Sequence, residues 1–480
     1  MLAHQKIALL DSLGRIEAGR AFGPREVNFV GCGAQISVVG GSNFGRFSSL
    51  MAYHLACHFL ADASEKPSAH SGAAQILLLR PVWRINPQLH APMESISSRI
   101  AKVSPSLTLA VTAQAKAMIA KGEEVYALAG GEPEVDTPQF IKDAAIEALQ
   151  AGKTKYTPAG GIPELRAALS KKFKIDNNLD YAAHQICVTG GAKMACYNAI
   201  LAVIEEGDEV IIPSPFWVSY PEMVRLAGGV PVIVETQEST GWKMTPEQFE
   251  EAMSPATKMV IINTPGNPTG AIYTAAELLA LGEIALGEDI IILSDEIYEK
   301  LVYGEAKHVS IASLSQELYD LTITVNGFSK AYSMTGWRLG YTAAPKALAD
   351  AIEKIQNHTT SNANSFAQYG ALAALEGDQS FIEDLRGEYD VKRQFMLGRL
   401  KAINNIRVVE PQGAFYFFVH TGKTGLKSMN LCDKLLSRYK VAAVPGIAFG
   451  YDEGIRLSYC TTLDILNEGL SRFEQFCREH

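Results

Sequence analysis

Short apolar runs alternate with amphipathic stretches along most of the chain after residue 140. The runs are rich in β-branched residues and predict strands at 185–188, 210–212, 230–234, 258–262, 290–293 and 322–325. Between several of them, apolar residues recur at helical spacing, as at 195–205 and 275–286. Strands that alternate with helices indicate an α/β fold class with a mostly parallel sheet. In such sheets ligands bind beyond the carboxyl ends of the strands.

The N-terminal segment, residues 1–92, departs from this pattern, because it shows no sustained alternation of strands and helices. An amphipathic stretch begins at Met93, in which Ile96, Ile100 and Val103 are spaced to share one face of a helix. We therefore place a boundary in organisation near residue 93.

Two local patterns in the N-terminal segment bear on its function. His54 and His58 have the spacing of metal ligands on a helix, and we expect a short helix around 51–60. No acidic or third ligand accompanies the pair, so we predict no metal site. Residues 31–33, Gly-Cys-Gly, resemble the start of a dinucleotide-binding loop, but Ile36 occupies the place of the third glycine and that interpretation fails.

Composition narrows the class of protein. Of the 480 residues, 47% are hydrophobic and 20% are charged, which is ordinary for a globular protein and excludes collagen-like, coiled-coil and largely disordered chains. The longest apolar runs, such as 76–79, are far shorter than the ~18 residues of a membrane span. The apolar run 7–10 ends at Asp11, which argues against a secretory signal. Seven scattered cysteines without a CxxC pair argue against a disulfide framework, so we expect a cytoplasmic protein.

Charge is distributed unevenly along the chain. The N-terminal segment holds eight Lys and Arg against five Asp and Glu, whereas the whole chain has a formal net charge of −9. The rest of the chain is therefore acidic, which argues against nucleic acid as a partner. A small anionic ligand is compatible with this balance, since local Arg and Lys decide its binding.

Polar and glycine-rich motifs follow the predicted strands. Residues 189–193, Thr-Gly-Gly-Ala-Lys, form either an ordinary turn or a helix start whose N–H groups bind an anion. Asn267 lies in a loop that two prolines and two glycines make irregular. Asp295, directly after a strand, is either a helix N-cap or a charge aimed into a pocket. Lys330 follows the last of these strands, and Arg338 comes eight residues later.

These motifs are more specific together than singly. In chain order they read Gly-Glu-Pro at 131–133, Gly-Lys-Thr-Lys-Tyr at 152–156, Pro-Phe-Trp-Val-Ser-Tyr at 215–220, Asn-Pro-Thr-Gly at 267–270, Ser-Asp-Glu-Ile-Tyr at 294–298, Ser-Lys at 329–330, Gly-Trp-Arg at 336–338 and Ile-Arg-Leu-Ser-Tyr at 455–459. In residue types, order and spacing, the chain resembles the class I pyridoxal-phosphate-dependent aminotransferases of fold type I. Among them it is most similar to the prokaryotic-type branch of the aspartate aminotransferases. The resemblance covers about residues 96–475.

The resemblance implies pyridoxal 5′-phosphate as the cofactor, which the protein must hold and tune. Lys330 matches the lysine that bonds to the cofactor aldehyde and later acts as a base. Asp295 matches the carboxylate that pairs with the pyridine nitrogen. Asn267 and Tyr298 match the donors to the phenolic oxygen, and Trp217 matches the aromatic residue stacked on the ring. The implied catalytic residues are Lys330, Asp295 and Tyr298.

The resemblance also implies a phosphate site and an oligomeric state. Gly191, Ala192 and Lys193 would offer N–H groups to the phosphate, and Arg338 would offer its planar guanidinium. Tyr156 matches a tyrosine that reaches the phosphate of the neighbouring subunit. The implied assembly is a homodimer with shared active sites.

The implied substrate site comprises Gly131, Trp217, Asn267, Arg456, Lys193 and Thr108. Arg456 matches the arginine that binds the substrate α-carboxylate in a bidentate pair. Lys193 and Thr108 match the residues that bind the distal carboxylate of dicarboxylic substrates in this branch. A lysine discriminates less sharply than a guanidinium, so we expect some activity with aromatic or prephenate-like substrates.

Two departures from the family pattern are visible. Where vertebrate-type enzymes have a serine three residues before the lysine, this chain has Gly327, and whether Ser329 compensates stays open. The entrance motif continues with Glu134 and Val135 where the family has Asp and Phe.

The implied architecture is a large domain with a mostly parallel mixed sheet flanked by helices, plus a smaller α/β domain. We expect 1–92 to be an N-terminal extension, 93–140 an N-terminal arm with part of the small domain, 141–388 the large cofactor-binding domain and 389–480 the rest of the small domain. The extension is expected to be poorly ordered or absent from the native product, and dispensable, with the functional chain beginning near Met93. A transit peptide fits less well, because the segment contains five acidic residues.

The expected reaction converts L-aspartate and 2-oxoglutarate to oxaloacetate and L-glutamate. An aromatic, prephenate or alanine aminotransferase of the same fold is the alternative, because specificity changes with few side chains. A non-catalytic regulator with a DNA-binding N-terminus is a remote alternative, since the segment shows no helix-turn-helix with a basic recognition helix. No metal, nucleic acid or membrane is expected to bind.

Overall fold

The computed structural model describes residues 26–31, 34–39 and 97–480. The chain forms two compact units, Met1–Pro87 and Gln88–His480, and each is described by itself.

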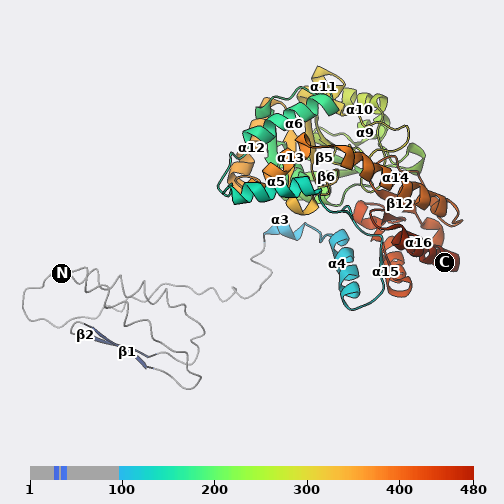
Figure 1. Ribbon diagram of the computed structural model, residues 1–480, viewed down its shortest axis with the longest axis horizontal. Helices are drawn as coiled ribbons and strands as arrows, with labels where there is room; N and C mark the ends of the chain where they lie inside the picture. The colour runs from blue at the N-terminus through green and yellow to red at the C-terminus, as the bar shows by residue number, and fades with distance from the viewer. Residues whose placement is uncertain (1–25, 32–33, 40–96) are drawn as a thin grey trace, which may run out of the picture. The chain divides into compact units, whose positions relative to one another are not determined.

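A two-stranded antiparallel sheet is the described part of the first unit (Figure 1). β1 (Glu26–Gly31) pairs with β2 (Ala34–Val39). A dinucleotide-binding loop joins a strand to a helix, whereas the described residues on both sides of 32–33 are strands. The histidine pair His54 and His58, and the helix expected near them, lie outside the described residues.

A seven-stranded sheet forms the centre of the second unit. In sheet order its strands are β4 (Ile186–Thr189), β10 (Gly340–Ala343), β9 (Thr322–Gly327), β8 (Ile291–Asp295), β7 (Thr257–Asn263), β5 (Glu209–Ser214) and β6 (Val230–Glu235). β10 runs antiparallel to both neighbours, and the other pairs are parallel. The six predicted strands are confirmed. The seventh, β10, was not predicted because its sequence Gly-Tyr-Thr-Ala contains no apolar run.

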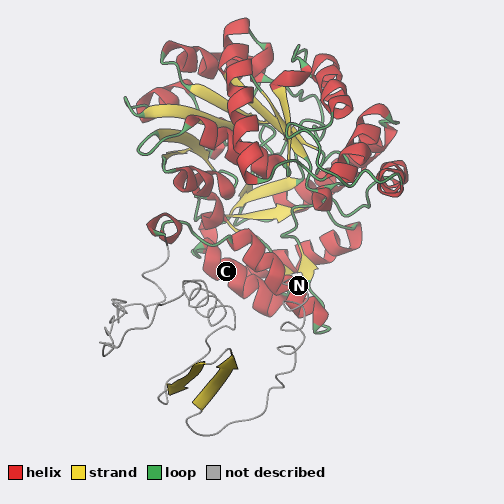
Figure 2. Cartoon of the chain, turned by 90° about the vertical axis from the view of Figure 1, so that its left-hand side faces the viewer, coloured by secondary structure: helices red, strands yellow, loops and turns green. Residues whose placement is uncertain are grey.

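Helices cover both faces of this sheet (Figure 2). They are α5 (Gln139–Gln150), α6 (Pro163–Asp176), α7 (Ala192–Val203), α8 (Ser219–Ala227), α9 (Pro246–Ala252), α10 (Ala275–Gly287), α11 (Gln316–Leu321), α12 (Lys346–Thr359) and α13 (Ser365–Glu376). Side chains alternate along a strand, so Ile211 joins an apolar core with Phe249, whereas Ile212 joins another with Val224. Burial on both faces explains why the strands read as continuous apolar runs.

A smaller sheet carries the C-terminal part of the chain. Its antiparallel order is β11 (Arg407–Val408), β12 (Tyr416–His420), β15 (Gly454–Ser458) and β14 (Val444–Pro445). The helices beside it are α14 (Ser380–Lys401), α15 (Ser428–Tyr439) and α16 (Leu463–Glu479). α14 continues through the domain boundary expected at 388/389. β13 (Val441–Ala442) pairs in parallel with β3 (Tyr126–Ala127), which joins residues before the large sheet to the C-terminal region.

The helical face predicted for Ile96, Ile100 and Val103 is wrong. α3 (Ser98–Ala101) contains only four residues, Ile100 is 51% exposed, and Ile96 lies outside the described residues. Pro105 disfavours helical backbone at the residue before it, so α3 does not continue into the next helix.

That next helix, α4 (Leu107–Ala120), is capped by Ser106, whose hydroxyl accepts a hydrogen bond from the Leu109 N–H. It packs against β13 and β14. Its amino end faces the cavity described below, so it positions side chains there.

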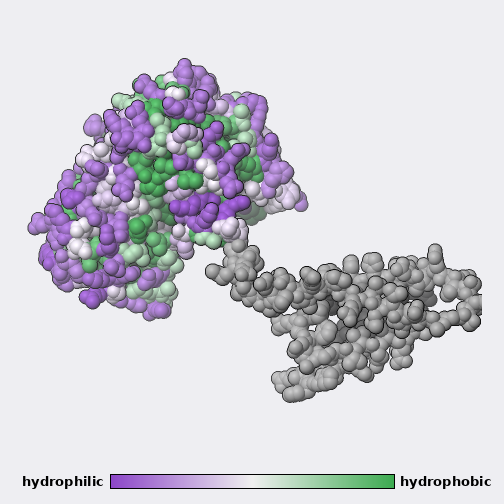
Figure 3. All heavy atoms as spheres, turned by 180° about the vertical axis from the view of Figure 1, so that it is seen from behind, coloured by the Kyte–Doolittle hydropathy of each residue, from purple (hydrophilic) through white to green (hydrophobic). Residues whose placement is uncertain are grey.

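The surface of the second unit is mixed in character (Figure 3). Large hydrophobic side chains are exposed on α5, at Phe140, Ile146 and Leu149, and on α4, at Leu109 and Ile119. Among the described residues, no helix is both long and apolar enough to cross a membrane.

Candidate active site

A cavity of about 450 Å³ opens at the carboxyl ends of β7, β8 and β9. Eleven of the residues singled out from the sequence line it, namely Thr108, Gly131, Ala192, Lys193, Trp217, Asn267, Asp295, Tyr298, Lys330, Arg338 and Arg456. They come from β8 and β15, from the starts of α4 and α7, and from the segments that connect the helices and strands. The sequence motifs therefore converge on one space although they are far apart in the chain.

The first residues of α7, Ala192 and Lys193, form one wall, and Gly191 directly precedes them. Gly191 has φ +95, and a Cβ there would lie 2.5 Å from Nη2 of Arg338. Arg338 donates hydrogen bonds to the carbonyls of Thr335 (2.9 Å) and Gly190 (3.4 Å). The first N–H groups of a helix have no partner within it, so the start of α7 and the guanidinium form a site for an anion.

The adjacent strand constrains this wall. A Cβ at Gly340 on β10 would lie 2.2 Å from the backbone nitrogen of Ala192. The strand therefore passes directly beneath the first turn of α7. The position of the N–H groups in that turn depends on this close approach.

Lys330 follows β9 and lies at the cavity wall. Its Nζ donates a hydrogen bond of 2.5 Å to the carbonyl of Gly131, and lies 5.7 Å and 5.5 Å from the ring centroids of Tyr298 and Phe415. Burial lowers the pKa of Lys330 to about 8, with a further contribution from the positive charge of Arg456. Its amine is therefore far easier to deprotonate than that of an exposed lysine.

Asp295 ends β8 and is only 3% exposed. Its Oδ2 accepts hydrogen bonds from the Tyr220 hydroxyl (2.6 Å) and the Cys196 thiol (3.7 Å), and its Oδ1 accepts one from the Ile297 N–H (3.2 Å). Burial raises the pKa of the Asp295 carboxyl, and these hydrogen bonds oppose that rise.

Arg456 lies on β15 and is 4% exposed. Its two terminal nitrogens donate to Oδ1 of Asn267 and to the carbonyl of Ala129, both at 3.0 Å. Its guanidinium stacks 4.3 Å from the Tyr416 ring. The remaining Nε is buried and has no hydrogen-bond partner among the described residues, which leaves a donor for a ligand. Tyr416 also contacts Tyr298, whose hydroxyl lies 3.0 Å from its own.

Lys193 and Thr108 line the outer part of the cavity. The Nζ of Lys193 lies 5.0 Å from the Trp217 ring, and burial followed by the charge of Arg338 lowers its pKa. The Thr108 hydroxyl lies 3.0 Å from that of Ser106 at the start of α4.

Three further positions bear on the sequence predictions. Tyr156 is 90% exposed and does not line the cavity of its own chain. Ser329 is 7% exposed and lines the cavity. A Cβ at Gly327 would lie 3.0 Å from the Cα of Gly340, so the backbone leaves little room for the serine that other enzymes have there.

Sequence reasoning did not single out several lining residues. They include Lys116, Glu132, Tyr220, Asn263 and Tyr416. Tyr220 belongs to the 215–220 motif and Glu132 to the 131–133 motif, so both could have been found from those motifs. Tyr416 and Lys116 stand outside the motifs, and only the packing of β12 and α4 brings them to the cavity.

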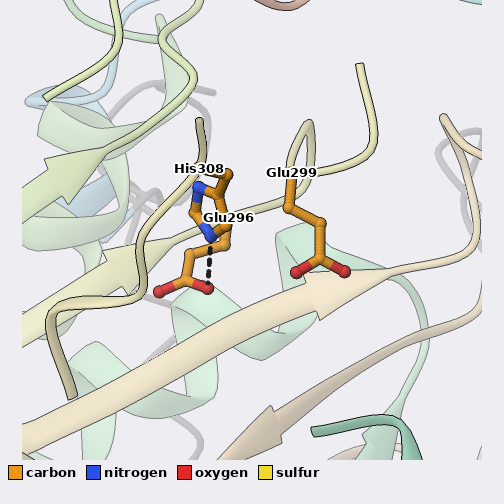
Figure 4. A group of neighbouring side chains, drawn as sticks. All are labelled: Glu296, Glu299 and His308. Atoms are coloured by element: carbon orange, nitrogen blue, oxygen red, sulfur yellow. Dashed lines mark hydrogen bonds and ion pairs between the residues drawn. The ribbon is translucent and has the colours of Figure 1, made fainter. Parts of the chain in front are cut away.

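A second group of ionisable side chains lies next to this site in the sequence (Figure 4). The ligand atoms of Glu296, Glu299 and His308 are within 4.8 Å of one another, as in a metal site. However, Nε2 of His308 lies 3.0 Å from Glu296, and Lys172 forms an ion pair with Glu299. Because His308 already partners Glu296 and Lys172 already partners Glu299, we interpret this group as a structural cluster and not as a metal centre.

Comparison with known proteins identifies the family. The family model for class I and II aminotransferases matches residues 123–473. The chain belongs to this family. An aspartate aminotransferase of Geobacillus stearothermophilus is 49% identical over 386 residues, which cover 79% of this chain and 98% of the relative. The aspartate/prephenate aminotransferase of Cereibacter sphaeroides is 45% identical over 396 residues, covering 80% and 99%.

A solved structure agrees with this membership. The aspartate aminotransferase of Thermus thermophilus with maleate is 41% identical and has a TM-score of 0.77, covering 80% of this chain and all of that one. The expected fold class, a fold-type I transferase, is confirmed. As an aminotransferase of this family, the chain is an enzyme that depends on pyridoxal 5′-phosphate.

The residues of the cavity fit this cofactor. The start of α7 and Arg338 suit its phosphate, as argued above. Asp295 is buried, and among residues 97–480 no ion pair joins it to a basic side chain, which suits a protonated pyridine nitrogen. Lys330 offers an amine with a lowered pKa.

Proposed function

We propose that the chain transfers the amino group of L-aspartate to 2-oxoglutarate, giving oxaloacetate and L-glutamate. The observation that carries this proposal is that one cavity is lined by Lys330 and Asp295 together with two further cationic groups for a substrate, Arg456 and Lys193. Two cations suit a dicarboxylate. Relatives named aspartate aminotransferases and the Thermus protein with maleate, a dicarboxylate, support it.

The cofactor would be held by a set of residues with distinct tasks. They are Gly191, Ala192, Lys193 and Arg338 for the phosphate, Asp295 for the pyridine nitrogen, Asn267 and Tyr298 for the phenolic oxygen, Trp217 for the ring face and Lys330 for the aldehyde. When bound, the cofactor supplies an aldehyde that captures an amino group and a ring that accepts electrons.

The chain's own residues then bind the substrate and move its proton. Arg456 binds the α-carboxylate, for which its buried Nε is still available. In the first half-reaction the Lys330 amine removes the proton from Cα of the amino-acid donor. In the second half-reaction it delivers a proton to Cα of the amino acid that is formed. A pKa of about 8 suits a base that works near neutral pH. Gly131, whose carbonyl contacts Lys330, lies at the substrate's entrance.

Lys193 and Thr108 would read the distal carboxylate of the substrate. Lys193→Ala should therefore lower kcat/KM for aspartate by about 10- to 100-fold more than for an apolar amino acid, because it removes one charged partner. A substrate panel of aspartate, alanine, phenylalanine and prephenate on both proteins measures this. Thr112→Ala, at a lining residue one turn further along α4, is the matched control.

The outcomes of this panel separate the candidate functions. Equal losses for all substrates would assign Lys193 to the phosphate and not to specificity. A preference of the unaltered enzyme for prephenate would favour the alternative function, which the name of the Cereibacter relative motivates.

We further propose a homodimer in the cytoplasm. Tyr156, 90% exposed, would reach the phosphate site of the neighbouring subunit, and the hydrophobic residues exposed on α5 would contribute to the contact. The domain assignments made from the sequence, with residues 1–92 as a dispensable extension, belong to the same proposal. Sedimentation of the purified protein tests the assembly, and a monomer with full activity would contradict shared active sites.

A further inference from the structure

Among residues 97–480, Asp295 receives only neutral donors. Its Oδ2 binds the Tyr220 hydroxyl from α8 and the Cys196 thiol from α7, and its Oδ1 binds the backbone N–H of Ile297. Tyr220 is 2% exposed and Cys196 is fully buried. Two side chains from different helices thus hold one carboxylate oxygen, whereas the other oxygen accepts a single backbone hydrogen bond, and Asp295 lines the cavity.

The direction of these hydrogen bonds follows from the acidity of the donors. Burial, and then the nearby negative charge of Asp295, raise the pKa of Tyr220 and of Cys196 well above their ordinary values. Both groups therefore keep their protons at neutral pH and donate them. Hydrogen bonds donated to a carboxylate favour its charged form.

Other ionisable groups near Asp295 do not perform this task. Glu296, the next residue, is fully buried, and its negative charge raises the pKa of Asp295. Tyr298 lies on the cavity side, and its hydroxyl contacts Tyr416. Burial and Glu296 both favour a protonated Asp295, and the hydrogen bonds from Tyr220, Ile297 and Cys196 favour the ionised form.

We propose that Tyr220, assisted by Cys196, is a positioning residue that keeps Asp295 ionised and turns its carboxylate toward the pyridine nitrogen of the cofactor. This inference rests on the proposed function, since it requires that the cofactor binds in this cavity. Tyr220 lines the cavity, but its hydroxyl is bonded to Asp295, so its proposed role acts through that carboxylate. Cys196 contributes less, because a thiol is a weak donor and its contact is 3.7 Å long.

The test measures cofactor affinity as a function of pH and does not use turnover. Apoenzyme is titrated with pyridoxal 5′-phosphate between pH 5 and 9, and the quenching of protein fluorescence reports binding. Affinity should fall on the acidic side, where Asp295 becomes protonated. Tyr220→Phe should move that midpoint upward by about one pH unit, and Cys196→Ala should move it by a smaller amount in the same direction.

Matched variants separate this role from a general loss of packing. Tyr181→Phe removes another fully buried tyrosine hydroxyl, which contacts Thr324 at 3.5 Å and not Asp295, and should leave the midpoint unchanged. In an Asp295→Asn background, Tyr220→Phe should have no further effect on the pH profile, because a double-mutant cycle detects only coupled residues.

The failure of this inference is distinguishable from failure of the proposed function. If the unaltered apoenzyme did not bind the cofactor, the proposed function would fail. If it bound the cofactor and Tyr220→Phe left the pH midpoint unchanged, or shifted it equally with Asn at position 295, then Tyr220 would be a packing residue only and the inference would be overturned.

Discussion

Asp295 and Glu296 are consecutive residues, both are almost completely buried, and their surroundings differ. The Asp295 carboxylate faces the cavity and receives hydrogen bonds from neutral groups alone. The Glu296 carboxylate accepts hydrogen bonds from Ser294 and Ser310 and is paired with His308. Asp295 thus has no basic partner among the described residues, whereas Glu296 is paired with a histidine.

Charge compensation distinguishes a functional site from a structural cluster of ionisable residues. Three candidate ligands stand close together at Glu296, Glu299 and His308, which is the usual sign of a metal centre. Their charges are compensated by neighbours, and no charge remains for a ligand. At Asp295 the compensation is missing, and the surrounding donors only moderate the cost of burial. An uncompensated buried charge beside a cavity is the better indicator of function.

The largest expected effect comes from removing the amine that works beside Asp295. Lys330→Ala should lower turnover by at least about 10⁴-fold, because it removes both the covalent attachment point and the base. The absorbance of the lysine-bound cofactor should disappear, and the circular dichroism spectrum should keep its folded form. Near-normal turnover in this variant would refute the assignment of Lys330.

Asp295→Asn should separate catalysis from stability at this position. We expect turnover to fall by about 10²- to 10³-fold, since a neutral amide no longer stabilises a protonated pyridine. Burial raises the pKa of Asp295 in the folded state, so the ionised group costs stability as pH rises above the unfolded value of about 4.

The apoprotein of Asp295→Asn should therefore be at least as stable at pH 7 as the original apoprotein. Urea unfolding of the two apoproteins measures this. A clear loss of stability would mean that the Asp295 charge is compensated in the folded protein.

His308→Ala should give the opposite result. It leaves Glu296 buried without its partner and should lower the free energy of unfolding by about 3–5 kcal/mol, with little change in turnover per folded molecule. Burial alone would lower the pKa of His308, but the charge of Glu296 and its hydrogen bond outweigh that effect and raise it.

The stability from this pair is thus fully present below the unfolded pKa of about 6.5 and is lost as pH rises through the folded pKa. The difference between the original protein and His308→Ala, measured by urea unfolding, should shrink as pH rises above about 6.5. A difference that grew with pH would show that the pair is not charged in the folded protein.

The smallest expected effect concerns the chain before the catalytic body. A protein that starts at Met93 should bind the cofactor, dimerise and turn over within about twofold of the full chain, because no sequence motif of the site lies before residue 93. Spectroscopy and steady-state kinetics of the two proteins make the comparison. Insolubility or loss of the cofactor would show that the first 92 residues belong to the fold.

The central strands could be predicted because their burial requires apolar residues, which are visible in the sequence. Strands buried on both faces need continuous apolar residues, so β5, β7 and β8 were visible as runs. β10 belongs to the same sheet, but its sequence Gly-Tyr-Thr-Ala shows no continuous apolar run from which a strand could be predicted. The helix α3 is short because Pro105 follows it. The prediction relied on the spacing of apolar residues and did not take this proline into account.

The motifs of the site could be predicted from the sequence, but the contacts between their residues could not. Each motif follows a strand end, and this is local information. The bond between Lys330 and Gly131 joins residues 199 apart in the chain, and that between Arg456 and Asn267 joins residues 189 apart. Such contacts depend on how the two sheets pack, which no local spacing contains.

The close passage of β10 beneath α7 has a consequence for tolerance to mutation. Gly340 carries no functional group and is not among the residues that line the cavity. Yet its replacement by alanine, the smallest possible change, would place a carbon 2.2 Å from the Ala192 nitrogen and push the helix start aside. A survey of sequence variants should therefore find that substitutions at Gly340 are tolerated as poorly as substitutions at Arg338. The absence of a side chain at Gly340 allows the start of α7 to take the position that forms the anion site.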